Sequence, residues 1–148
     1  MAKSTGLGLI ESSSILDALK PDFVVIVGDR FEMMSVVIAA AYQNIKIAHT
    51  MGGEVTGTID ESIRHAITKF AHLHFPANVD SKKRIIRMGE KEEDVFDFGC
   101  PRIDLIRNQL ESHSSHVILK DIFNKYGGVG ASFDINSRYL VVSQHPKY

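Results

Sequence analysis

Three short segments of the sequence carry side chains suited to acid–base chemistry or to binding an anion. The first is Gly28-Asp29-Arg30, the second is HTMGGE at residues 49–54, and the third is DESIRH at residues 60–65. Carboxylates and imidazoles transfer protons, and arginine binds phosphate oxygens. Together the segments supply the groups that a reaction on an anionic substrate needs.

The first two segments each follow an apolar run that predicts a strand. Residues 23–27 read FVVIV and end at Gly28, and residues 45–49 form a second, shorter run. Continuous β-branched runs are typical of parallel strands covered on both faces. Because ligands bind at the carboxyl ends of such strands, we expect the two segments to meet at one edge of a sheet.

The third segment opens a predicted helix over residues 60–72. The free N–H groups at its start suit a phosphate, and Gly52 and Gly53 allow a ligand close to the backbone. Two structural interpretations stay open. Thr58 and Glu61 match a capping box, and Asp60 and Arg64 match an ion pair on one helix face.

The remaining pattern alternates helices and strands. Helices are predicted over residues 10–19, 32–43, 80–88 and 101–110, and strands over residues 74–75 and 95–98. Lys20-Pro21 ends the first helix, because the residue before proline avoids helical geometry. This order predicts an α/β fold with a parallel, Rossmann-like sheet. Residues 117–126 are compatible with a further helix, residues 127–138 with a linker, and residues 139–143 with the first strand of a second domain.

Composition excludes several classes of function. The net charge of −1 over 148 residues argues against nucleic-acid binding. The single cysteine, Cys100, cannot form an internal disulfide, which favours a reducing cytoplasmic setting. The seven histidines are not set at metal-ligand spacing, and the longest apolar run, residues 36–41, is too short to span a membrane. Neither GxGxxG nor GxxxxGK[ST] occurs.

Taken together, the motifs resemble the hydrolysing UDP-N-acetylglucosamine 2-epimerases over residues 6–146. The run that carries most of the resemblance is GGEVTGTIDESIRHAITK, residues 52–69. Shorter matches are GDRFE at residues 28–32, MGE at 88–90, GCP at 99–101 and QHP at 144–146.

The resemblance implies two Rossmann-like domains facing a cleft, the glycosyltransferase-B-like architecture. Residues 1–126 are then the second part of the first domain, 127–138 a linker and 139–148 the start of the second domain. It implies removal of the C2 proton of the sugar, elimination of UDP and hydration of the glycal, which gives N-acetylmannosamine for a sialic-acid-type pathway. It implies a UDP-sugar substrate, a homo-oligomer when full length, and no coenzyme, metal, membrane or nucleic-acid partner.

The resemblance also assigns roles to single positions. The residues it places in catalysis are Asp29, Glu54, Asp60 and His145. The residues it places at the substrate are Arg30, His49, Gly52, Gly53, Glu61, Arg64 and His65.

Two departures from the family pattern bear on function. Met51 stands where some members carry a catalytic glutamate, so either Glu54 serves instead or the substrate differs, with a UDP-2,4-diacetamido sugar as the alternative. The chain is also less than half as long as family members, which favours an internal fragment. Such a fragment is expected to be weakly active, or inactive and only a binding module.

Overall fold

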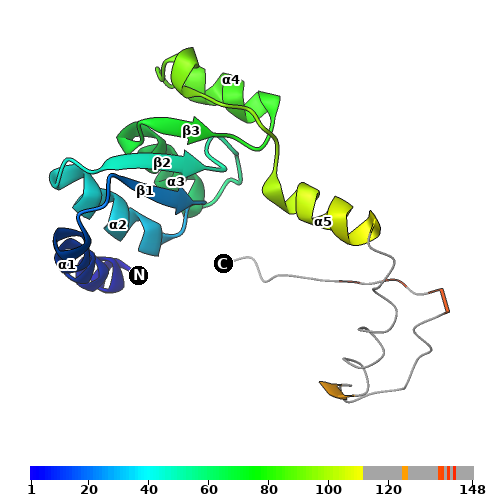
Figure 1. Cartoon of the computed structure of the whole chain (residues 1–148), viewed down its shortest axis with the longest axis horizontal. Helices are drawn as coiled ribbons and strands as arrows, with labels where there is room; N and C mark the ends of the chain where they lie inside the picture. Colours follow the sequence, from blue (N-terminus) through cyan, green and yellow to red (C-terminus); the bar gives the residue numbers. More distant parts are fainter. Residues whose placement is uncertain (112–124, 127–136, 139, 141, 143–148) are drawn as a thin grey trace. The chain divides into compact units, whose positions relative to one another are not determined.

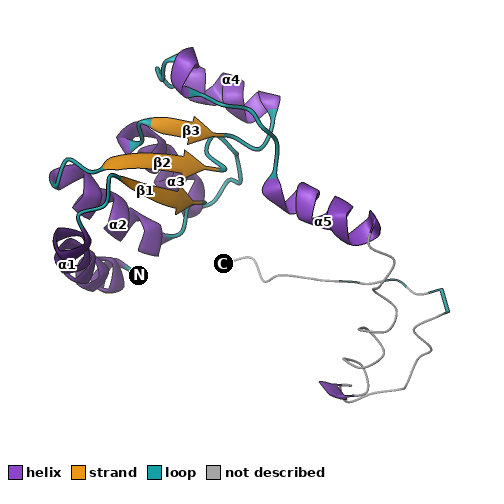
Figure 2. Cartoon of the chain, viewed as in Figure 1, coloured by secondary structure: helices purple, strands orange, loops and turns teal. Residues whose placement is uncertain are grey.

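The computed structural model describes residues 1–111, 125–126, 137–138, 140 and 142. The chain divides into two compact units, Met1–Ile103 and Asp104–Tyr148. The elements in order are α1 (Ala2–Leu19), β1 (Phe23–Val27), α2 (Phe31–Tyr42), β2 (Lys46–Thr50), α3 (Ile59–Phe70), β3 (Leu73–Phe75), α4 (Val79–Arg87), the 3₁₀ turn η1 (Glu92–Asp94) and α5 (Pro101–Glu111) (Figure 2).

A parallel three-stranded sheet, in the order β1-β2-β3, organises the first unit (Figure 1). One face is built from residues such as Ile26 and Ile47, which are buried together with Val37 of α2 and Ile67 of α3. α2 and α3 therefore cover this face, and α1 packs on α2. The predicted α/β fold with a parallel sheet is confirmed.

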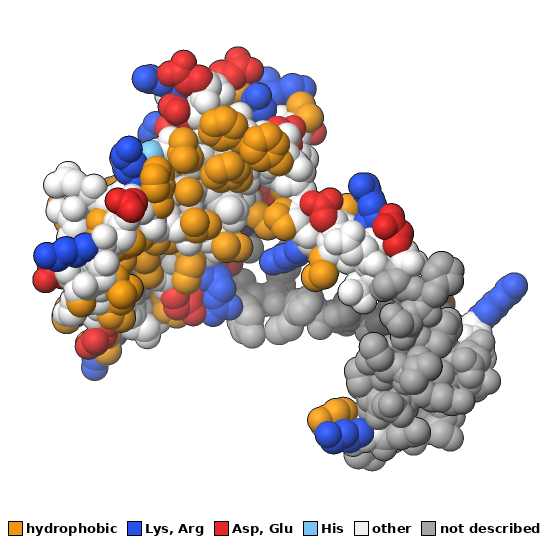
Figure 3. Space-filling view, viewed as in Figure 1, with side chains coloured by type: hydrophobic (Ala, Val, Ile, Leu, Met, Phe, Trp, Pro, Cys, Tyr) orange, Lys and Arg blue, Asp and Glu red, His pale blue; other side chains and the backbone are white. Residues whose placement is uncertain are grey.

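The opposite face of β1 is open among the described residues, which corrects the expectation that both faces are covered. Phe23, Val25 and Val27 are 45%, 63% and 57% exposed. Figure 3 shows hydrophobic side chains gathered over this side of the sheet. The error arose because an apolar run indicates the preference of both faces for burial, whereas α2 and α3 both lie on one side.

α1 is longer than predicted, beginning at Ala2 instead of near residue 10. Its first turns are rich in glycine and serine, yet they pack closely on α2: a Cβ at Gly8 would lie 3.0 Å from Oγ of Ser35. The hydroxyl of Ser35 also donates to the carbonyl of Thr5 at 2.9 Å. The helix ends where predicted, at Lys20, whose φ of 45° is left-handed.

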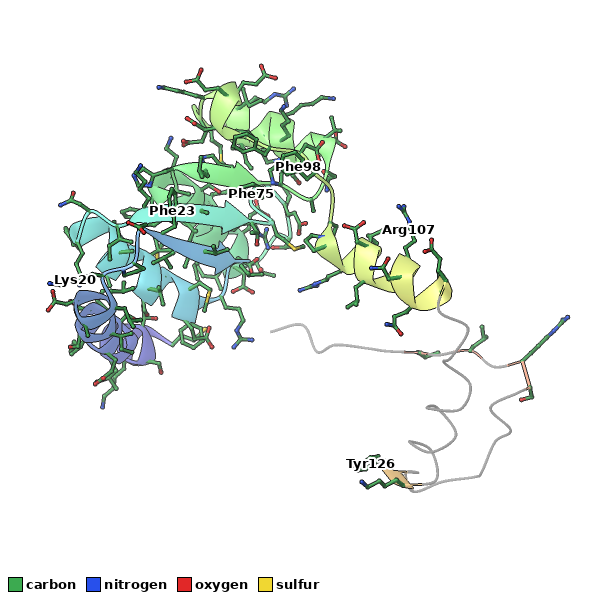
Figure 4. The ribbon with its side chains drawn as sticks, viewed as in Figure 1. Lys20, Phe23, Phe75, Phe98, Arg107 and Tyr126 are labelled. Atoms are coloured by element: carbon green, nitrogen blue, oxygen red, sulfur yellow. The ribbon has the colours of Figure 1, made fainter. Side chains whose placement is uncertain are left out.

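The strand predicted over residues 95–98 is reduced to one bridge between His74 and Val95. Stacking replaces further pairing, since the ring of Phe96 lies 5.6 Å from Phe75 and 5.9 Å from Phe98. Figure 4 shows Phe75 and Phe98 close together, at 6.4 Å between ring centroids. The predicted helix at residues 117–126, the linker and the strand at 139–143 lie largely outside the described residues. The domain boundaries thus stay predictions.

Candidate active site

The carboxyl ends of β1 and β2 bring the first two polar segments together. The amide of Gly28 donates to the carbonyl of Thr50 at 3.3 Å, and the amide of Met51 donates to the carbonyl of Phe75 at 2.9 Å. These bonds continue the sheet by one residue past each strand. The β1–α2 loop and the β2–α3 loop therefore start side by side, at the edge that the sequence indicated.

Arg64 of α3 ties both loops together. Its guanidinium forms an ion pair with the carboxylate of Asp29 and donates to the carbonyl of Glu54 at 2.7 Å. The Arg64 side chain is 5% exposed, and burial lowers its pKa, whereas the Asp29 side chain keeps 21% of its surface exposed. Arg64 thus holds a partly accessible carboxylate in place. The alternative ion pair between Asp60 and Arg64 does not form.

His49 faces the interior instead of the loop edge. It is fully buried, with Nε2 2.9 Å from the carbonyl of Gly28 and Nδ1 3.3 Å from Oγ1 of Thr68. Burial is the main cause that lowers its pKa, to about 4. A neutral ring bonded to the protein at both nitrogens has no free group for a sugar. This arrangement therefore makes His49 a support for the β1–α2 loop.

Gly52 and Gly53 lie tightly against protein atoms. A Cβ at Gly52 would lie 3.0 Å from Nδ1 of His49, and a Cβ at Gly53 would lie 2.4 Å from the carbonyl of Ser81 in α4. Gly53 also has a φ of +78°, which side chains rarely adopt. The carbonyl of Gly53 accepts a hydrogen bond from Arg84. The two glycines hence fix the β2–α3 loop between β2, α3 and α4.

Glu61 fixes the other end of this loop. Its carboxylate accepts bonds from the amides of Thr56 and Gly57, both at 2.7 Å, while Thr58 makes no side-chain cap bond. The capping box is therefore wrong in detail, because Glu61 reaches past the cap residue. The bonds from Gly57 and then Thr56 lower the pKa of Glu61, and the charge of His65, whose Nε2 lies 3.8 Å away, lowers it further.

The other carboxylates and Arg30 stand nearer to solvent. The Arg30 side chain is 73% exposed and bonds to Glu32 at 2.9 Å. The bond to Glu32 is the main cause that raises the pKa of Arg30, and the negative charges of Glu32 and Asp60 raise it further. Asp60 and Glu54 are half-buried. His145 lies outside the described residues.

Comparison with known proteins matches residues 1–148 to the model of one family, described as UDP-N-acetylglucosamine 2-epimerase. The chain belongs to this family. A UDP-N,N'-diacetylbacillosamine 2-epimerase (hydrolyzing) of Legionella pneumophila is 41% identical over 99% of this chain and 36% of the relative. A GDP/UDP-N,N'-diacetylbacillosamine 2-epimerase (hydrolyzing) of Campylobacter jejuni is 44% identical over 73% of this chain and 28% of the relative.

Solved structures of epimerases agree with the fold. The UDP-GlcNAc 2-epimerase of Methanocaldococcus jannaschii, in complex with UDP-GlcNAc and UDP, is 25% identical with a TM-score of 0.74. It covers 82% of this chain, and the chain covers 34% of it. The Neisseria meningitidis enzyme bound to UDP-GlcNAc has a TM-score of 0.73 at 24% identity. The chain thus spans about a third of the length of the epimerases it matches.

Three contacts of the candidate site were not predicted from the sequence. They are the ion pair between Arg64 and Asp29, the hydrogen bond between Thr68 and His49, and the hydrogen bond from Arg84 to the carbonyl of Gly53. One signal was available for Thr68, since it follows Arg64 by four residues and so shares its helix face. The described residues contain no group of three or more metal-ligating side chains, and no helix among them is long and apolar enough to cross a membrane.

Proposed function

We propose that the whole protein is a hydrolysing 2-epimerase that converts a UDP-2-acetamido sugar and water into UDP and the free C2-epimeric sugar. The observation that carries this proposal is the partly exposed Asp29 carboxylate, held in place by its ion pair with the buried guanidinium of Arg64. An ionised carboxylate of fixed position is what abstraction of a carbon-bound proton requires. The names of two relatives, at 41% and 44% identity, support the same reaction.

The reaction divides into two steps. Asp29 takes the C2 proton, the C1–O bond breaks, and its electron pair leaves with UDP, which gives the glycal. Water then adds across the double bond, its hydroxyl at C1 and a proton at C2 on the opposite face. Asp60 and Glu54, with His145, are the groups we assign to protonation and to activation of water. Asp60 also lies at the start of α3, where helix N–H groups favour a diphosphate.

We assign different roles to Arg30 and Arg64. Arg30 is exposed and free to reach the departing diphosphate, although it bonds Glu32 in this structure. Arg64 is buried, so it acts through Asp29 and the carbonyl of Glu54. Glu61 and His65 shape the loop that carries Glu54, and Gly52 and Gly53 fix that loop's path.

For the sugar, we propose a UDP-2,4-diacetamido sugar of the diacetylbacillosamine type. Two relatives, at 41% and 44% identity, carry this substrate in their names. Met51, half-buried with a left-handed φ of 61°, sets an apolar side chain at the loop. UDP-N-acetylglucosamine is the second candidate, because a Neisseria meningitidis relative at 38% identity is named for it.

The wider setting follows from the same proposal. We place the product in the supply of a sialic-acid-type sugar, made in the cytoplasm by a homo-oligomer without coenzyme. Since residues 1–148 match about a third of each relative, we expect the chain by itself to be weak or inactive.

The test is an NMR time course in D2O with each of the two UDP-sugars. We expect free UDP and a 2-epimeric sugar deuterated at C2, formed faster from the diacetamido substrate. Asp29→Asn should abolish turnover, whereas Asp22→Asn, an exposed aspartate at the opposite end of β1, should not.

If the chain alone is silent, residues 1–148 should replace the matching segment of the Legionella relative. Product from this chimaera, lost with Asp29→Asn, would support the proposal. Silence from a folded chimaera on both sugars would refute it, and turnover of UDP-N-acetylglucosamine alone would refute the diacetamido assignment.

A further inference from the structure

α3 reaches the β1–α2 loop at two points. Arg64 pairs with the side chain of Asp29, and one turn later Thr68 contacts His49, which bonds the carbonyl of Gly28. The first contact acts on the carboxylate and the second on the backbone immediately before it. Asp29 is thus held from both its side chain and its peptide link.

Hydrogen-bond chemistry sets the direction of the second contact. The carbonyl of Gly28 can only accept, so Nε2 of His49 carries the hydrogen in that 2.9 Å bond. The ring is fully buried and neutral at neutral pH, because burial lowers its pKa to about 4. Nδ1 then presents a lone pair toward the Thr68 hydroxyl.

The single hydrogen of the Thr68 hydroxyl serves two acceptors, the carbonyl of Arg64 and this lone pair of Nδ1. The hydroxyl oxygen lies 3.3 Å from Nδ1 and 3.0 Å from the carbonyl of Arg64. That carbonyl also receives the ordinary helix bond from the residue 68 amide, whereas Nδ1 faces no other donor in the described chain. A hydrogen shared between the two acceptors leaves neither the carbonyl of Arg64 nor Nδ1 facing only lone pairs of the hydroxyl oxygen. Gly52 closes the site, since a Cβ there would lie 3.2 Å from Oγ1 of Thr68.

We propose that Thr68 is a positioning residue that, through His49, fixes the carbonyl of Gly28 and so the carboxylate of Asp29. The proposal rests on the proposed function for its kinetic consequence, though not for the contact itself. Without the hydroxyl, the ring loses the bond that orients it, and the β1–α2 loop gains freedom at the residue before the base. A displacement of about 1 Å at a reacting group lowers turnover by up to about 100-fold.

The decisive variant is Thr68→Val, which keeps the shape and removes the donor. On the whole protein we expect kcat to fall by about 10- to 100-fold with KM changed by less than about twofold. The Asp29 carboxyl ¹³C resonance and the His49 ring ¹⁵N resonances should shift. Thr68→Ser should restore all three. Ser35→Ala, which removes a buried hydroxyl bond from α2 to the carbonyl of Thr5 in α1, should change none.

A Thr68→Val protein with unchanged kcat and an unchanged Asp29 resonance would overturn the proposal. If Thr68→Val does not fold, Thr68→Ala removes the donor with a smaller side chain, and wild-type values for it would overturn the proposal equally. If the wild-type protein turns over neither UDP-sugar, the proposed function fails. The Asp29 and His49 resonances then still test whether Thr68 positions Asp29. A shift in Thr68→Val that Thr68→Ser lacks supports the positioning role, and no shift refutes it.

Discussion

Replacing Arg64 with methionine removes the charge that links the two loops while keeping a long side chain. The variant loses the ion pair to Asp29 and the 2.7 Å bond to the carbonyl of Glu54. The Asp29 carboxylate then stays in a site that exposes 21% of its side chain, without its partner. The carbonyl of Glu54 also loses its donor.

The magnitude follows from the burial of the two partners. Breaking a buried ion pair by removing one member costs about 3–5 kcal/mol. Water reaches part of Asp29, which places the cost at the lower end, about 3 kcal/mol including the lost bond to Glu54. For a unit of the size of Met1–Ile103, 1 kcal/mol corresponds to about 4 °C, so Tm should fall by about 12 °C.

The assay is thermal and urea unfolding of the chain, followed by circular dichroism. Arg30→Met is the matched control, because Arg30 is 73% exposed and its Tm should equal the wild-type value. The double variant Arg64→Met/Asp29→Asn should be more stable than Arg64→Met alone, since it leaves no unpaired charge at this site. A loss of under about 4 °C for Arg64→Met, or simple additivity in this cycle, would refute the assignment of the pair.

Three further predictions concern the groups around this pair. Gly53→Ala should destabilise the chain by more than about 2 kcal/mol in urea unfolding, since its Cβ meets the α4 backbone, while Gly57→Ala, at a φ of +69° in open space, should cost only about 1 kcal/mol. Burial lowers the pKa of folded His49 from 6.5 to about 4, so its contribution to the free energy of unfolding is fully present above pH 6.5 and is lost as the pH falls toward 4, a loss of roughly 3 kcal/mol. His49→Gln should reduce this dependence when unfolding is measured at several pH values. Glu61→Ala should speed hydrogen exchange at the amides of Thr56 and Gly57 and leave the amide of Lys82, bonded within α4, unchanged.

The sequence located β1, β2 and β3 and the loops that follow them, because apolar runs and glycines are local signals, whereas the strand predicted over residues 95–98 is only a bridge. β1 has its predicted bounds, and the edge where Asp29 and Glu54 lie follows from the rule for parallel sheets. The partner of Arg64 was not predictable in the same way. Helical spacing offered Asp60, four residues away, whereas the actual partner is 35 residues distant and is brought near by the β1-β2 pairing together with the packing of α3 on the sheet.

Burial also decides what other residues of the candidate site contact. His49 has the type of a substrate ligand, and only its side of β2, the side beneath α3, makes it a support. The same applies to Gly53, whose need for glycine comes from Ser81 on a later helix. α1 starts early because Gly8 and Ser35 fit each other, which outweighs the weak helix preference of its first turns.

These corrections change what the run from Gly52 to Lys69 encodes. Gly52, Gly53 and Arg64 each contact another part of the protein. Much of the motif therefore specifies how the β1–α2 loop and the β2–α3 loop pack against α3. Because these contacts hold the two loops, other positions in the loops can differ in sequence without moving Asp29 or Glu54. Met51 is such a position, since its amide is bonded to Phe75 while its side chain stays half-exposed. Under the proposed function, a change of substrate sugar that works through Met51 would therefore require no change in the groups that hold Asp29.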